Sequence, residues 1–196
     1  SNPDIIIFTG DMFTTHDLDE DIITNVTEFF SAFECELKFA ILGNHDYYGN
    51  ASSIVPGILE EAGFTLLVNE NTQVTINDTM YNIIGLDDLM QGDSDYTASL
   101  ETSTEFDNNI VLSHEPDTFT VIYPYNIKYV FSGHSHGGQL RLPFIGDIYN
   151  VPGAKTYTEK QYHINDTYLF ISFGLGESVV PFRLFNNRSI EIYEFS

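Results

Sequence analysis

The sequence predicts an α/β fold with a second, partly antiparallel sheet. In the first 62 residues, short apolar runs alternate with longer stretches whose apolar residues recur at helical spacing. From residue 64 onward the apolar runs are short and separated by turn-forming residues, as in β-rich structure. An α/β beginning followed by a β-rich remainder favours a layered α/β core carrying an additional sheet.

Composition limits the function before any motif is considered. The chain has 196 residues, 42% of them hydrophobic, which is enough for one domain over residues 1–196 with a substantial core. Its net charge of −22 argues against nucleic acid as a simple electrostatic partner. No run of 18 apolar residues is present, so the sequence predicts no membrane span. The single cysteine, Cys35, excludes an internal disulfide and a thiolate zinc site.

The first part of the chain reads as two strands and two helices. Residues 3–9 form a β-branched apolar run after a proline, which predicts a buried strand. An amphipathic helix is expected over 17–33, and a second strand over 38–42. The next helix is expected over 52–62, with Pro56 in or near its first turn and Gly63 past its end.

The remaining elements are mostly short strands. Asn77-Asp78 separates two of them and indicates a tight hairpin turn. We expect a polar loop with some helix over 89–108, a short helix over 117–123 and a long loop over 143–165. The expected strands cover 64–69, 73–76, 80–84, 109–112, 127–131, 168–173 and 190–195.

Residues able to bind a metal follow four of the apolar runs. They are Asp11, then Asn44-His45-Asp46, then His114, then His134 and His136. The carboxyl ends of strands in one sheet lie along one edge, so these side chains can converge although the first and the last are 125 positions apart in the sequence. Imidazole together with carboxylate and amide oxygens suits Mn, Fe, Zn, Ni or Co better than Ca or Cu(I).

Each of these residues also has a purely structural interpretation. A single histidine at a strand end is more often a packed side chain than a ligand, and Asn and Asp favour turns. Four of the six histidines nevertheless share the same strand-end context, which favours a common function. His16 and His163 lack this context and are interpreted as structural.

Taken in order, the motifs resemble those of the calcineurin-like metallophosphoesterases. They are Gly10-Asp11, Gly43-Asn44-His45-Asp46, His114 and Gly133-His134-Ser135-His136. Residues 137–144 and 174–176 are further similar to a bacterial branch that is often anchored or exported at the cell membrane. The resemblance implies an α/β/β/α sandwich of two mixed sheets flanked by helices. The compartment stays open.

The family pattern also implies roles for the individual residues. Two divalent ions would hold a phosphoryl group, with Asp11 bridging them. Asn44, His114 and His134 would complete the second metal site, and His136 would belong to the first. His45 would act as general acid or stabilise charge, with Asp46 orienting its ring, while a metal-bound hydroxide attacks phosphorus.

One departure from the pattern limits this expectation. The family begins with Asp-x-His at the end of its first strand, and no such triplet precedes Gly10. We therefore expect that the first strand of the fold is absent from this chain, that one metal binds more readily than two, and that catalysis is weak. The alternative is a non-catalytic metal-binding or surface-interaction module that retains the fold.

The substrate class is the least constrained expectation. A phosphoester is implied, with a phosphodiester favoured, and the substrate could be a small molecule or lipid-linked. Tyr47, Tyr48 and the Asp87-Asp88 pair lie on loops near the expected metal edge and are candidates for shaping the substrate pocket, or for packing. The loop residues Phe144, Ile145 and Ile148 are candidates for contact with a lipid-like group.

Overall fold

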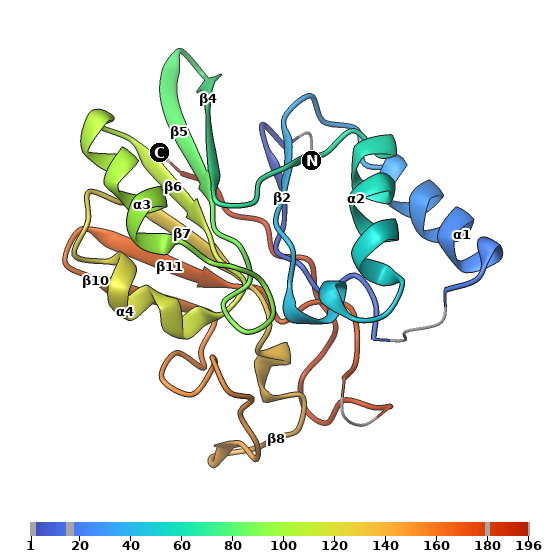
Figure 1. The fold of residues 1–196 in the computed structure, drawn as a ribbon. Coiled ribbons are helices and arrows are strands. Elements are labelled where there is room, and N and C mark those ends of the chain that lie inside the picture. The colour runs from blue at the N-terminus through green and yellow to red at the C-terminus, as the bar shows by residue number, and fades with distance from the viewer. Residues whose placement is uncertain (1–2, 15–17, 179–180, 196) are drawn as a thin grey trace.

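Two β-sheets pack face to face, with helices on the outside of each (Figure 1). The structure is a computed structural model that describes residues 3–14, 18–178 and 181–195. Within these ranges, no helix is both long enough and apolar enough to cross a bilayer. His16 and the expected start of the first helix at residue 17 lie outside the described residues.

The smaller sheet has three parallel strands. They are β1 (Ile6–Phe8), β2 (Lys38–Ala40) and β3 (Thr65–Leu66), paired in that order. Helices α1 (Glu20–Ser31) and α2 (Ala51–Glu61) cover its outer face. The resemblance implied two mixed sheets, but the described strands of this sheet all run in one direction.

The larger sheet has six strands and is mixed. Its order is β10-β11-β7-β6-β5-β4, with parallel pairing from β11 to β5 and antiparallel pairing at both edges. Asn77 and Asp78 join β4 to β5 with φ of 49° and 62°, which confirms the predicted tight turn. The strands are β4 (Glu70–Ile76), β5 (Thr79–Gly85), β6 (Asn109–Leu112), β7 (Tyr129–Ser132), β10 (Gln161–Ile164) and β11 (Thr167–Ile171).

Short helices and one hairpin complete the described structure. The loop expected over 89–108 contains α3 (Tyr96–Glu101) and the 3-10 helix η2 (Thr102–Glu105). The remaining elements are η1 (Asn44–Tyr47), η3 (Pro116–Thr118), α4 (Phe119–Ile122), η4 (His136–Gly138), β8 (Arg141–Leu142) and β9 (Gly146–Asp147).

The apolar side chains fill three layers, because successive strand residues point to opposite faces. In β5, Ile83 lies between the two sheets and Ile84 lies under the helices of the larger sheet. In β6, Ile110 and Leu112 face the smaller sheet, and Val111 faces outward. The third layer joins α1 and α2 to the smaller sheet. This arrangement confirms the predicted α/β/β/α class.

Several boundaries differ from the predictions for identifiable reasons. Helix α1 begins at Glu20, because the Asp19 carboxylate accepts the N–H of Ile22 at 2.8 Å and caps the helix. Helix α2 begins at Ala51, which puts Pro56 in its second turn, directly after the first. The expected loop over 143–165 contains two strands, β9 and β10. Strand β10, residues Gln161–Ile164, pairs with β11.

The predicted strand over 190–195 is wrong, since this described segment forms no strand. Its aromatic residues instead pack on the inner face of the larger sheet. The rings of Tyr193 and Phe170 lie 4.3 Å apart between centroids, as do those of Phe195 and Tyr129. The alternating pattern is therefore explained by packing onto a sheet without joining it.

Candidate metal centre

Four of the five predicted metal ligands come together where the carboxyl-terminal ends of strands from the two packed sheets meet. Asp11 follows β1 and Asn44 follows β2, so both come from the smaller sheet. His114 follows β6 and His134 follows β7, so both come from the larger sheet. The sequence suggested convergence along one sheet, whereas the structure assembles the group from two. We call the group of Asp11, Asn44, His114 and His134 the metal edge.

Three residues of this region have strained backbones. Asp11, His134 and His136 have φ of 62°, 59° and 47°, in the left-handed region that residues with a Cβ seldom adopt. Next to them, a Cβ on Gly43 would lie 2.5 Å from Asp11 Oδ1 and 2.4 Å from His114 Cε1. Strain and close approach of this kind are typical of functional sites, where the surrounding structure holds side chains in a required direction.

The imidazoles of His114 and His134 each have one nitrogen fixed by a backbone carbonyl. His114 Nδ1 lies 2.6 Å from the Thr9 carbonyl oxygen, and His134 Nε2 lies 2.7 Å from that of Pro152. A carbonyl can only accept, so both of these nitrogens carry hydrogen. In the neutral rings, His114 Nε2 and His134 Nδ1 are therefore left with bare lone pairs.

These two lone pairs face each other and the carboxylate of Asp11. His114 Nε2 is 3.1 Å from His134 Nδ1 and 3.2 Å from Asp11 Oδ2. Either a second proton on His114 or a bound cation would relieve this contact between acceptors. Burial opposes this charge, but Asp11 raises the pKa of His114 to about 10, and His114 holds the pKa of the buried Asp11 carboxyl well below its usual range.

The donor set fits a divalent transition metal. Ligand atoms of Asp11, His114 and His134 all lie within 4.8 Å of one another. Asn44 is buried, and its Oδ1 has no hydrogen-bond partner among the described residues. A buried amide oxygen without a donor is costly unless a ligand satisfies it. The sequence predicted a mixed N/O shell of three imidazoles, a carboxylate and an amide oxygen. The metal edge contains two of these imidazoles with the carboxylate and the amide oxygen.

His136 lies beside the metal edge without joining the group of three. Burial lowers the pKa of His136 to about 4, with Asp11 opposing this shift and Arg183 adding to it. Its ring is therefore neutral and able to bind a metal at physiological pH. Its backbone carbonyl is held by Asn186 Nδ2 at 2.6 Å.

Asp46 makes different contacts from those expected. Its Oδ2 accepts the N–H of Asp11 at 2.8 Å and of Gly43 at 2.9 Å, and its Oδ1 accepts the N–H of Met12 at 2.8 Å. Burial raises the pKa of Asp46 to about 6, the three N–H groups oppose this, and the charge of Asp11 adds to it. Its hydrogen bonds thus hold the loop that carries Asp11, and none of them goes to the ring of His45.

His45 is placed at the metal edge through its backbone. Its N–H donates to Asp11 Oδ1 at 2.8 Å. The ring Nδ1 is buried and has no hydrogen-bond partner in the described part of the chain. The ring packs edge-on against Tyr48, with centroids 5.8 Å apart. By contrast, His163 stacks on Tyr168 at 3.9 Å on β10 and β11, in agreement with its structural interpretation.

The other flagged loop residues connect the two sheets. The Tyr47 hydroxyl donates to Asp87, which joins η1 after β2 to the loop after β5. Two further carboxylates are fully buried: Asp88, which follows Asp87 in the sequence, and Glu115, which follows His114. Burial raises the pKa of Glu115 to about 7, the positive charge of His114 opposes this, and Asp88 adds to the rise.

Sequence reasoning missed the groups that orient the ligands. The carbonyls of Thr9 and Pro152 belong to the backbone, so no residue type in the sequence indicates their role. Asp117 was also missed: its carboxylate accepts the N–H groups of Lys155, Thr156 and Tyr157 at 2.9, 2.8 and 3.2 Å. These bonds, with Asp117 N–H to the Gly153 carbonyl at 2.8 Å, hold the loop that presents Pro152 to His134.

Comparison with known proteins identifies the family to which the sequence is similar. The family model of the calcineurin-like phosphoesterases matches residues 1–138. The uncharacterized metallophosphoesterase YkuE of Bacillus subtilis is 34% identical over 98% of this chain and 68% of its own length. The phosphodiesterase YaeI of Escherichia coli is 27% identical over 89% of this chain and 64% of its own. The UDP-2,3-diacylglucosamine pyrophosphatase LpxG of Chlamydia trachomatis is 29% identical over 73% of this chain and 56% of its own.

Proposed function

This chain belongs to the calcineurin-like phosphoesterase family, and we propose that it hydrolyses phosphodiesters or related phosphoesters with divalent metal ions bound at the metal edge. The observation that carries this proposal is the convergence of three acceptor atoms from two sheets: Asp11 Oδ2, His114 Nε2 and His134 Nδ1. Acceptors at this separation repel one another unless a proton or a metal ion lies between them.

We assign the ligands by what each residue can offer. Asp11, Asn44, His114 and His134 would hold one ion, and Asp11 and His136 would contribute to a second at a dinuclear site. When bound, the ions neutralise charge on the phosphoryl oxygens and lower the pKa of an attacking water. Because the described residues offer four ligands to one ion and only two to the other, we expect the ion with four ligands to bind more tightly.

His45 is the proposed catalytic residue of this chain. Its backbone is fixed by Asp11, while its ring Nδ1 has no partner within the described structure. The ring would donate a proton to the leaving oxygen or hold a phosphoryl oxygen in place. Asp46 would support the reaction as a positioning residue, by keeping Asp11 and Gly43 in register.

The proposed substrate class draws on two relatives. One is a phosphodiesterase and another is a pyrophosphatase of UDP-2,3-diacylglucosamine, and both names denote cleavage at a substituted phosphate. The chain spans 64% and 56% of these two proteins, so their substrates serve only to choose the first compounds to assay.

The test is hydrolysis of bis(p-nitrophenyl) phosphate with added manganese, together with direct measurement of bound metal. We expect His134→Ala to lose at least about 100-fold in kcat/KM and to bind less metal, because it removes a ligand. His163→Ala is the matched control and should have the same kcat/KM and the same amount of bound metal as the wild type.

His45→Ala tests the proposed catalytic residue. This variant should bind as much metal as the wild type but lose hydrolytic turnover. Metal binding by the wild type without turnover would reject hydrolysis and favour the non-catalytic module.

A further inference from the structure

The C-terminal segment, residues 139–196, differs in composition from the rest of the chain. Residues 139–196 contain five of the seven Lys and Arg residues but only six of the 29 Asp and Glu residues, so this segment is nearly neutral in a strongly acidic chain. Of the sixteen exposed large hydrophobic side chains among the described residues, eleven lie in 144–195. Apolar exposure and low charge therefore coincide in one part of the chain.

The β8–β9 hairpin carries the most exposed of these side chains. Phe144 is 108% exposed and Ile145 is 75% exposed, relative to the reference for each residue type. Phe144 also has φ of 70°, a conformation that glycine or asparagine would adopt at lower cost. An aromatic side chain that is fully exposed among the described residues and stands at a strained position does not stabilise the fold by burial, so it must be explained in another way.

A second apolar segment lies against the base of this hairpin. Arg141 N–H donates to the Leu184 carbonyl at 2.9 Å, and Leu184 N–H donates to the Gln139 carbonyl at 3.1 Å. Phe182 and Phe185 on this segment are 53% and 70% exposed. We call the exposed side chains of the two segments the apolar rim: Phe144, Ile145, Ile148, Phe182 and Phe185.

The apolar rim is connected directly to the metal edge. Asn186, next to Phe185, donates from Nδ2 to the carbonyls of His136 at 2.6 Å and Gly137 at 2.9 Å. The chain leaving the hairpin at Ile148 reaches Pro152, whose carbonyl holds the ring of His134. In Figure 1, β8 lies at the end of the molecule opposite the β4–β5 hairpin.

We propose that the apolar rim docks the protein on a lipid surface, with Phe144 and Ile145 entering the acyl-chain region. The tip of the hairpin protrudes into solvent, and a protruding apolar loop suits entry into a soft apolar phase. Docking there would place the metal edge toward the lipid headgroups. The proposal concerns binding alone and stands whether or not the chain hydrolyses phosphoesters.

The distribution of charge in the protein favours a zwitterionic over an anionic lipid surface. Two basic side chains near the rim form ion pairs: Arg141 with Asp147 at 3.0 Å and with Glu159 at 2.8 Å, and Arg188 with Glu177. The guanidinium of Arg183, next to Phe182, instead donates to the backbone carbonyls of Phe173 at 2.7 Å and Gly176 at 2.6 Å, so it is turned toward the protein. The acidic remainder of the chain would be repelled by an anionic surface. Binding should therefore be stronger on zwitterionic phosphatidylcholine than on phosphatidylglycerol, and the difference should shrink as salt is added.

The first experiment is co-sedimentation with phosphatidylcholine vesicles. We expect the wild type to bind and the double variant Phe144→Ser, Ile145→Ser to partition at least about tenfold less, because two apolar side chains no longer enter the lipid. Met80→Ser is the matched control, since Met80 is 55% exposed at the β4–β5 hairpin, and should change partitioning less than twofold. Failure of the wild type to bind, or binding that survives the double substitution, would overturn the proposal.

A second readout uses the absence of tryptophan from the sequence. In Phe144→Trp the only indole fluorescence should shift to the blue on addition of vesicles and be quenched by brominated acyl chains, whereas Met80→Trp should show neither effect. Sedimentation velocity tests the other possible occupant, a second copy of the chain. A wild-type dimer that the double variant dissociates, without vesicle binding, would assign the apolar rim to self-association and reject lipid docking.

Discussion

Asp46 and Asp117 have the same structural role in the two halves of the metal edge, one half from the smaller sheet and one from the larger sheet. Each carboxylate accepts three backbone N–H groups, and each set belongs to a loop that directs a metal ligand. Asp46 serves the smaller sheet and holds Asp11, while Asp117 serves the larger sheet and holds the loop of Pro152. They differ in environment: Asp46 is fully buried, whereas two of the three bonds of Asp117 lie at the surface and the third, from Tyr157 N–H, is partly buried.

This difference in environment predicts how substitution of each carboxylate should affect stability and metal binding. A buried N–H that loses its acceptor cannot turn to water and costs about 1–3 kcal/mol, whereas an exposed N–H is rehydrated at little cost. The smaller-sheet half should therefore couple metal binding to the stability of the whole fold. The larger-sheet half should allow metal binding to change with little effect on stability.

The largest expected effect is that of Asp46→Ala. It leaves the N–H groups of Asp11, Met12 and Gly43 without acceptors, and removal of a buried charge offsets part of that cost. We expect the free energy of unfolding to fall by about 3 kcal/mol at pH 7, measured by urea denaturation of the metal-free protein. Asp166→Ala, at the exposed β10–β11 turn, should change it by less than about 0.5 kcal/mol. An unchanged denaturation midpoint for Asp46→Ala would refute its structural role.

Asp117→Ala should separate metal binding from stability. Its loss frees the loop that presents the Pro152 carbonyl, so the His134 ring is less well oriented, and manganese affinity should fall about tenfold. The unfolding free energy should fall by only about 1 kcal/mol, because water can satisfy the exposed N–H groups. Competition with a chromogenic chelator measures the affinity. Equal losses of stability in the Asp46 and Asp117 variants would remove the distinction between the two halves.

The sequence predicted the residues of the metal edge better than their assembly. An apolar run followed by a polar residue is a local pattern, so Asp11, Asn44, His114 and His134 could be identified one by one. That β1 and β2 belong to one sheet and β6 and β7 to another depends on long-range pairing, which no local pattern specifies.

The groups that orient the ligands were less predictable still. The carbonyls of Thr9 and Pro152 are present at every residue, so their role appears only in three dimensions. The contacts of Asp46 were missed for a related reason. Adjacency in sequence to His45 indicated a bond to that ring, whereas the fold brings backbone N–H groups 34 and 35 residues away to the carboxylate. The segment 190–195 shows the same limit, because its alternation does not reveal whether it pairs or only packs.

Tyr47→Phe tests the direct link between the two halves. It removes the hydroxyl that donates to Asp87 and leaves the ring in place. We expect a loss of about 1 kcal/mol in unfolding free energy and no change in manganese affinity, because neither residue belongs to the metal edge. A double-mutant cycle with Asp87→Asn should give a coupling of similar size. A large fall in metal affinity with no change in stability would show that the link acts on the ligands.

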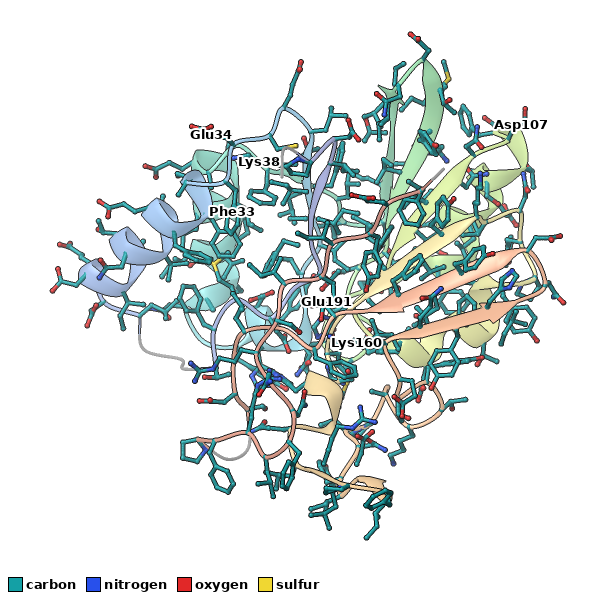
Figure 2. The ribbon with its side chains drawn as sticks, turned by 180° about the vertical axis from the view of Figure 1, so that it is seen from behind. Phe33, Glu34, Lys38, Asp107, Lys160 and Glu191 are labelled. Carbon is teal, nitrogen blue, oxygen red and sulfur yellow. The ribbon has the colours of Figure 1, made fainter. Side chains whose placement is uncertain are left out.

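The smallest expected effect concerns a third carboxylate, Glu191, whose hydrogen-bond partners among the described residues are all side chains. It accepts from Ser172 Oγ at 2.7 Å and Ser189 Oγ at 2.6 Å, and pairs at 2.9 Å with Lys160, which lies beside it in Figure 2. Burial opposes ionisation, but the two hydroxyls and Lys160 outweigh it and lower the pKa of Glu191 below its usual value.

A lowered carboxyl pKa stabilises the fold above the ordinary value of 4.5 and ceases to do so as pH falls through the folded value. Glu191→Gln should therefore cost about 0.5 kcal/mol at pH 7, because Lys160 is half exposed, and nothing once Glu191 is protonated in the wild type. Urea denaturation across this pH range, with Glu194→Gln as the exposed control, measures the difference. A deficit that persisted undiminished in acid would show that Glu191 acts by packing and not by charge. Manganese affinity should be unchanged, since Glu191 fixes the chain beside β11 and orients no ligand of the metal edge.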